Sequence, residues 1–209
     1  MGLDGEGVRK QFLHVSCGFL KGKNKETKEP ISGRSFTGHL LNIERFDDEF
    51  EGQPVSKIRL TMKDELEDFE TQISFTEQSW YAVGFFARVQ NLDITLPVTI
   101  GASPSDKNEK ISFCWMKQGA NKIEKMPTAV SPEKVAAIAG RAGSKDTYNW
   151  LSVFPVFDAI TAQVVEKIHA SYGGIKDPEQ NKKDKQNNPP VHHNTGNDVA
   201  NGADDDLPF

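Results

Sequence analysis

Basic and apolar residues alternate along residues 55–63, which is the pattern of a β-strand with one buried face. The apolar residues of this run share one face, and Lys57, Arg59 and Lys63 share the other. Cationic side chains spaced in this way can neutralise the phosphates of a nucleic acid and release its counterions. A strand whose charged face is merely solvated has the same pattern, so the spacing alone leaves both interpretations open.

A second alternating run, residues 111–117, carries aromatic residues. Phe113, Trp115 and Lys117 fall on one face of the predicted strand, whereas Cys114 and Met116 fall on the other. Exposed rings could stack on unpaired bases, at roughly 1–3 kcal/mol per base. Buried rings would be ordinary core residues. The pattern does not say which face is outside.

Lysine-rich segments flank these strands and complete the candidate nucleic-acid site. We expect polar loops over residues 21–33 and 102–110, the first carrying Lys23 and Lys25 and the second Lys107 and Lys110. Flexible cationic loops beside a groove suit a binder that tolerates any sequence. Loops of ordinary soluble domains have a similar composition.

The order of the predicted elements suggests how these residues are positioned. Strands at 36–46, 55–63 and 69–75 precede a helix over about 77–92, and strands at 94–100 and 111–117 follow it. Strand, strand, strand, helix, strand, strand is the order of the OB-fold, a small five-stranded barrel. We therefore predict a mainly β fold, with an unrelated β-barrel or an α+β sandwich as alternatives. Residues 8–20 predict an extra N-terminal strand.

The chain divides into four predicted regions: an OB-fold domain at 1–128, a helical extension at 129–174, a linker at 175–203 and an acidic tip at 204–209. Ser131 and Pro132 predict the start of one helix, and Pro155 the start of another that ends before Gly173. The second helix carries an apolar stripe, Phe157, Ile160, Val164 and Ile168, which is expected to pack on the barrel or on another subunit.

The last 35 residues differ in composition from the rest. The linker is rich in Asn, Asp, Lys and Pro and has few sizeable apolar residues, so we expect it to be disordered. The final residues join three carboxylates to an apolar end: Asp204, Asp205, Asp206, Leu207, Pro208 and Phe209. Such a tip suits a partner protein that offers an apolar pocket with a basic rim.

This tip resembles the C-terminus of the bacterial and phage single-stranded DNA-binding proteins. That family ends in consecutive Asp residues, an aliphatic residue, Pro and Phe, and here Leu207 stands where Ile is commonest. The resemblance implies an OB-fold body, single-stranded DNA as the ligand, and partners among helicases, primases, nucleases, recombinases and polymerase subunits. The extra N-terminal strand and the helical region are not part of the common bacterial form, which suggests a divergent phage, plasmid or mobile-element member.

Other classes of protein find less support in the sequence. It has no phosphate-binding loop, dinucleotide fingerprint, nucleophile elbow or zinc-protease helix, so we expect neither an enzyme nor a cofactor. The neighbouring His192 and His193 have no Cys beside them, and no metal site is expected.

The remaining expectations concern the cell and the partners. The two cysteines are expected to be reduced, and the chain is expected to be cytoplasmic with no membrane partner. The net charge of −5 requires any DNA surface to be a local patch. Assembly into a homo-oligomer stays open. The alternative function is a protein-interaction adaptor whose OB body binds no DNA.

Overall fold

The computed structural model describes residues 9–24, 27–50, 52–64, 69–126, 131–135 and 147–172. The strands are β1 (Arg9–Ser16), β2 (Phe19–Lys23), β3 (Pro30–Gly33), β4 (Ser35–Phe50), β5 (Gln53–Lys63), β6 (Phe69–Thr76), β7 (Val98–Pro104), β8 (Ser112–Gln118), β9 (Asn121–Lys122), β10 (Glu133–Val135) and β11 (Thr147–Asn149). The helices are α1 (Trp80–Val89) and α2 (Phe154–Tyr172). The mainly β fold expected from the sequence is confirmed.

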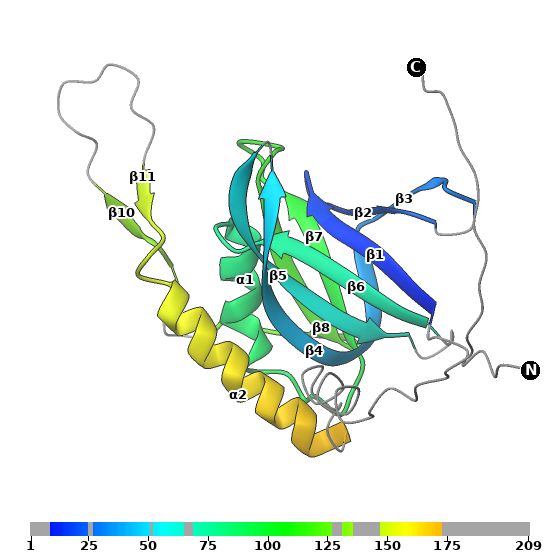
Figure 1. The fold of residues 1–209 in the computed structure, drawn as a ribbon. Helices are drawn as coiled ribbons and strands as arrows, with labels where there is room; N and C mark the ends of the chain where they lie inside the picture. The colour runs from blue at the N-terminus through cyan, green and yellow to red at the C-terminus, as the bar shows by residue number, and fades with distance from the viewer. Residues whose placement is uncertain are drawn as a thin grey trace, which may run out of the picture. The chain divides into compact units, whose positions relative to one another are not determined.

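Nine strands form one curled sheet in the order β3-β2-β1-β6-β5-β4-β7-β8-β9 (Figure 1). β1 runs parallel to β6, and the other neighbouring strands run antiparallel. The long strand β4 joins the two halves, because its residues 35–38 pair with β7 and residues 39–50 pair with β5. Its bulge at Leu40 to Asn42 lies where the partner changes. Bulges of this kind bend a strand and help a sheet to curl.

The enclosed side of the sheet and helix α1 form the core. Ser79 caps the helix by accepting a hydrogen bond from the Ala82 backbone N–H, at 3.1 Å from its side-chain oxygen. Every residue of the helix after Trp80 is buried, which is expected for a helix enclosed by a curled sheet. The largest fully buried side chains come from the sheet and both helices: Leu20, Leu40, Ile58, Leu60, Met62, Ile73, Tyr81, Phe85, Phe86, Ile100, Met116 and Phe157.

The sheet differs from the predicted five-stranded barrel. β4, β5, β6, α1, β7 and β8 follow the predicted order along the chain, but within the described strands β8 does not pair with β6. β1 occupies the free edge of β6 instead, and β2 and β3 extend the sheet from there. The result is a larger, open sheet with the curvature of a half-barrel.

The N-terminal region is a hairpin rather than one strand followed by a loop. Cys17 and Gly18 turn the chain with φ values of 51° and 75°, the two positive values that a tight hairpin turn requires. The predicted strand at 8–20 therefore becomes β1 and the start of β2, while the predicted loop at 21–33 contains the rest of β2 and all of β3. Turns of this kind usually have Asn, Asp or Gly before the second Gly. Here Cys17 takes the first position, so only Gly18 indicated a turn in the sequence.

Of the two helices predicted after residue 129, the described residues of that region (131–135 and 147–172) contain one. Glu133–Val135 pairs with Thr147–Asn149 as a short antiparallel ladder, so Ser131 and Pro132 do not start a helix. A Ser-Pro pair also suits the entry to a strand, and pairing across the hairpin decides the outcome here. The second predicted helix is present as α2.

Helix α2 packs its apolar stripe against the body. Phe157, Ile160, Val164 and Ile168 are at most 4% exposed, as the spacing of the stripe predicts. The ring of Phe157 stacks on Phe86 of α1, with centroids 4.2 Å apart. Arg45 of β4 adds an ionic connection, because its guanidinium pairs with both the buried Glu77 and Asp158 of α2.

The predicted linker and tip lie outside the described residues. Contact clustering assigns residues 1–174 to one compact unit. All the elements above belong to this unit. No helix among the described residues combines the length and the apolarity needed to cross a bilayer.

Replacing Phe157 by Ala tests whether α2 is an integral part of the core. We expect the free energy of unfolding to fall by about 3–5 kcal/mol, since a stacked, fully buried ring is lost and a cavity remains. Urea denaturation measures the change. The matched control is Gln163→Ala on the exposed side of the same helix, with an expected effect within about 0.5 kcal/mol. Equal effects of the two substitutions would contradict this packing.

Candidate nucleic-acid interface

Outward-facing side chains of β2, β1, β6 and β5 form one continuous row across the sheet. Lys21 of β2 lies opposite His14 of β1, and His14 lies opposite Ser74 of β6. Ser74 lies in turn opposite Arg59 of β5. Since partners in a ladder point to the same side of a sheet, these four side chains share its outer face.

The rows on either side add further cations to this face. Lys63 of β5 lies opposite Glu70 of β6, which lies opposite Lys10 of β1. Lys57 lies two residues beyond Arg59, and Lys23 two residues beyond Lys21, on the same side of their strands. We call this surface the cationic face and define it by the residues Lys10, Phe12, His14, Phe19, Lys21, Lys23, Phe46, Lys57, Arg59 and Lys63.

Aromatic rings lie among these cations. The guanidinium of Arg59 sits 4.0 Å from the centroid of the Phe46 ring, and that of Arg34 sits 4.8 Å from the Phe19 centroid. The ring of Phe12 is 52% exposed on β1. A guanidinium held flat on a ring keeps its charge while offering a planar surface to solvent. The cationic face therefore presents both charge and flat groups.

Carboxylates pair with cations of this face. Arg59 contacts Glu44 at 3.0 Å, Lys57 contacts Asp48 at 2.5 Å, and Lys10 contacts Glu70 at 3.7 Å. Surface pairs of this kind add little to the stability of a fold, because water solvates the separated charges well. Without a ligand these pairs position the cations. A phosphate could replace the carboxylates at a small cost in free energy.

Two titratable groups of this face, His14 and Asp48, have lowered pKa values. Partial burial lowers the pKa of His14 from its usual value, and the neighbouring charges of Lys21 and Lys57 lower it further. The pKa of the Asp48 carboxyl is lowered as well, mainly by its hydrogen bond with Lys57 and then by the Glu49 backbone N–H. The nearby positive charges act in the same direction in both groups, after burial for His14 and after the hydrogen bonds for Asp48.

Phe113, Trp115 and Lys117 lie on the outward face of β8. Cys114 and Met116 are buried beneath them, whereas Phe113 is 41% exposed and Lys117 is exposed. The indole of Trp115 lies on the backbone of β7, since a Cβ on Gly101 would come within 2.1 Å of the ring. A side chain at position 101 would displace this ring.

The structure brings some of the residues predicted for the site together and places others elsewhere. Lys23, Lys57, Arg59 and Lys63 meet on the cationic face, although Lys23 comes from strand β2 and not from a loop. Phe113, Trp115 and Lys117 lie on β8, which β4 and β7 separate from β5 in the sheet. Lys107 and Lys110 belong to the connection between β7 and β8. Lys25 lies outside the described residues, as do Asp204, Asp205, Asp206, Leu207, Pro208 and Phe209.

Sequence reasoning missed the contribution of β1. Lys10, Phe12 and His14 alternate with Gln11, Leu13 and Val15, which is the signal of a strand with one outward face. Reading that alternation could have placed them on one surface. It could not have placed the surface beside Arg59, because that depends on the pairing of β1 with β6.

Titration of His14 tests the potential of the cationic face. We expect a pKa below the usual 6.5, measured from the His14 ring protons by NMR, and a higher pKa in the Lys21→Gln variant. Since the fold disfavours charged His14, acidification through this pH region favours the unfolded chain. Stability from this residue is therefore fully present above about pH 6.5 and falls below it. Lys122→Gln, on the distant strand β9, should leave the pKa unchanged. A wild-type pKa at or above 6.5 would contradict the proposed potential.

Comparison with protein-family models, with curated proteins and with solved structures finds no match for this chain. What it binds is therefore inferred from its own residues.

Proposed function

We propose that the protein binds single-stranded DNA, without sequence preference, on the cationic face. The observation that carries this proposal is the row of cations and flat groups on neighbouring strands of one sheet face. Cations attract the phosphate backbone whatever its sequence, and every base has a flat surface that can stack. The two kinds of contact together favour an unpaired strand.

The dimensions of the face support this proposal. Neighbouring strands are about 4.8 Å apart, so the three spacings from β2 to β5 cover about 14 Å. The row can therefore follow a segment of backbone rather than hold one isolated anion. The exposed ring of Phe12 lies within this width, on β1, where an unstacked base could rest on it. Bases in a duplex are already stacked and paired, which makes such a contact with a duplex costly.

The order of the strands supports a relationship with the OB-fold. We propose that β4, β5, β6, α1, β7 and β8 correspond to its five strands and helix, with β1 inserted at the edge of β6 where a closed barrel would place β8. OB-folds bind oligonucleotides on the face of their second and third strands. In this chain those strands are β5 and β6, which carry the centre of the cationic face.

The acidic tip supplies the second half of the proposal. By its resemblance to single-stranded DNA-binding proteins, we propose that Phe209 and the preceding Asp residues recruit replication, recombination or repair enzymes. A bound strand would then be protected by the body and delivered to an enzyme held through the tail.

The triple variant Lys57→Ala, Arg59→Ala, Lys63→Ala tests the cationic face. We expect weaker binding to an oligo-dT strand, and a log–log salt dependence shallower by about 2, since about 0.7 counterions are lost per phosphate contact. Tryptophan fluorescence titration at several salt concentrations measures both quantities.

The matched control removes three other lysines of the described part of the chain. The variant Lys107→Ala, Lys122→Ala, Lys125→Ala has the same net charge as the first and alters exposed residues away from the face. Equal losses in the two variants would show that general charge drives binding and would sink the proposed interface. An intact chain that binds no oligo-dT at low salt would instead favour the adaptor function.

Deleting residues 201–209 tests the role of the tip. Because the tip is acidic and the face is cationic, we expect the deletion to tighten oligo-dT binding at low salt. A full-length variant with Asp204, Asp205 and Asp206 changed to Asn should reproduce the gain. The two affinities are measured by the same titration, and an unchanged affinity would count against competition between the tip and DNA.

A further inference from the structure

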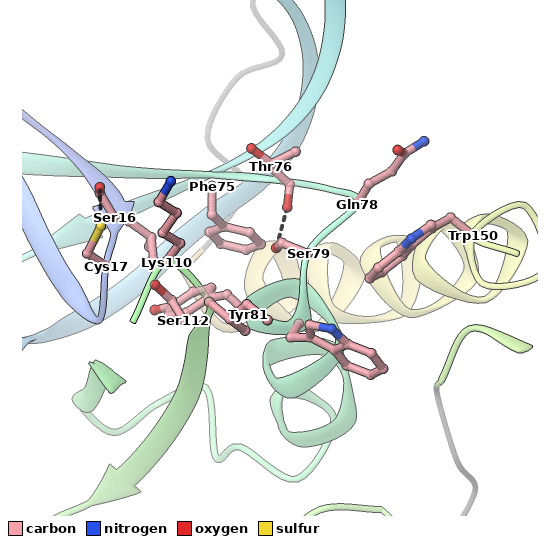
Figure 2. A pocket seen from close by; sticks show the side chains of 13 residues that line it. Ser16, Cys17, Phe75, Thr76, Gln78, Ser79, Tyr81, Lys110, Ser112 and Trp150 are labelled. Carbon is pink, nitrogen blue, oxygen red and sulfur yellow. Dashed lines mark hydrogen bonds between the residues drawn. The ribbon is translucent and has the colours of Figure 1, made fainter. Parts of the chain in front are cut away.

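A cavity of about 430 Å³ opens where the turn between β1 and β2 faces the beginning of α1. Figure 2 shows Lys110 and Ser112 on one side of it and Trp150 across from them. The end of β6 forms another wall. A space of this size accommodates a small organic ligand.

The cavity forms because β6 and β8 do not pair in the described sheet, so the sheet is not closed between them. The backbone N–H of Gly18 donates a hydrogen bond to the Ser112 hydroxyl, at 2.8 Å, and Gly18 packs tightly against Pro104. The β1–β2 turn thus touches the region where β8 begins, without a strand ladder between β6 and β8. Ends of strands that meet in this way leave a space between them, which side chains line.

The cavity borders one end of the cationic face. Thr76 lines the cavity and is the ladder partner of Lys57. Ser16 also lines it and is the partner of Phe19. Residues that line the cavity are therefore direct ladder partners of residues of the cationic face.

The lining combines aromatic rings with one ammonium group. Trp80 and Trp150 pack edge to face, with centroids 5.8 Å apart, and Tyr148 packs on Trp80 edge to face, with centroids 5.1 Å apart. Lys110 is the basic residue of the lining, which includes no carboxylate. The first turn of α1 also lacks acidic residues, so its partial positive charge is not offset there. Hydroxyl and amide groups, including Gln78 and Ser79, provide donors and acceptors.

We propose that this cavity holds one nucleotide of the bound strand, its base against Trp80 and Trp150 and its phosphate toward Lys110. The proposal rests on the function proposed above and deepens it, because it names a second contact point for the same strand. An indole offers a large flat surface to a base, and an ammonium attracts a phosphate. A cavity with both, and with no carboxylate in its lining, fits a nucleotide better than a neutral or cationic ligand.

The test follows the indole N–H signals of Trp80, Trp115 and Trp150 in the full chain by NMR. On titration with thymidine monophosphate, the signals of Trp80 and Trp150 should shift and that of Trp115 should stay in place. Thymidine alone and inorganic phosphate alone should shift them less at equal concentration. An oligonucleotide of ten thymidines should displace the nucleotide. Absence of shifts in both cavity indoles would overturn the proposal.

Lys110→Glu should weaken nucleotide binding roughly tenfold, since an attractive contact becomes repulsive. The matched control is Lys122→Glu, an equal charge change on strand β9, at an exposed residue outside the lining. It should stay within about twofold of the unaltered chain, as expected for a screened charge outside the site. Equal weakening by both variants would overturn the proposal.

The triple variant of the cationic face separates this inference from the function on which it rests. It should retain the indole shifts with thymidine monophosphate while its affinity for the oligonucleotide falls. Loss of those shifts would assign them to the face and overturn the cavity site. If the unaltered chain binds the nucleotide but not the oligonucleotide, the proposed function fails. If it binds the oligonucleotide without indole shifts, only the cavity site fails.

Discussion

The parallel pairing of β1 with β6 is the interaction on which the arrangement of the outer face depends. It satisfies the backbone groups along the edge of β6, which would otherwise be exposed. It also places Lys10, Phe12 and His14 in register with the outward residues of β6, and through them with Arg59. The same pairing keeps β8 away from β6 in the described sheet, so a cavity forms at the ends of these strands. One ladder thereby positions both proposed contacts with a DNA strand.

The charge of the cationic face differs from the net charge of the chain. The chain carries −5 overall, yet lysines and an arginine gather on this face, and the charges of Lys21 and Lys57 add to the effect of partial burial in lowering the pKa of His14. The carboxylates that pair with Lys57 and Arg59 do not cancel these charges, because such pairs are weak in water and the partners can separate. The proposed contacts with phosphates would require these pairs to separate.

The core maintains the shape of the curled sheet. Helix α1 fills the enclosed side, and α2 adds a second layer through Phe157 and the rest of its stripe. Arg45 connects β4 to both helical regions through Glu77 and Asp158. These contacts lie on the side of the sheet opposite the cationic face. The outer side chains can therefore change without removing the contacts that maintain the fold.

The sequence by itself determined the features that depend on local periodicity. Alternation along 55–63 assigned the outward position of Lys57, Arg59 and Lys63, and spacings of three and four assigned the buried stripe of α2. Tertiary structure alone decided which strands are neighbours, because pairing joins residues far apart in the chain. In the folded chain β1 pairs with β6, and the expected loop at 21–33 contains strand residues. A short antiparallel ladder begins near Ser131, where a helix was expected. Tertiary structure also separated Phe113 and Trp115 from β5, since β4 and β7 lie between them. Hydrogen bonds between strands are non-local, and no period within one segment encodes the partner.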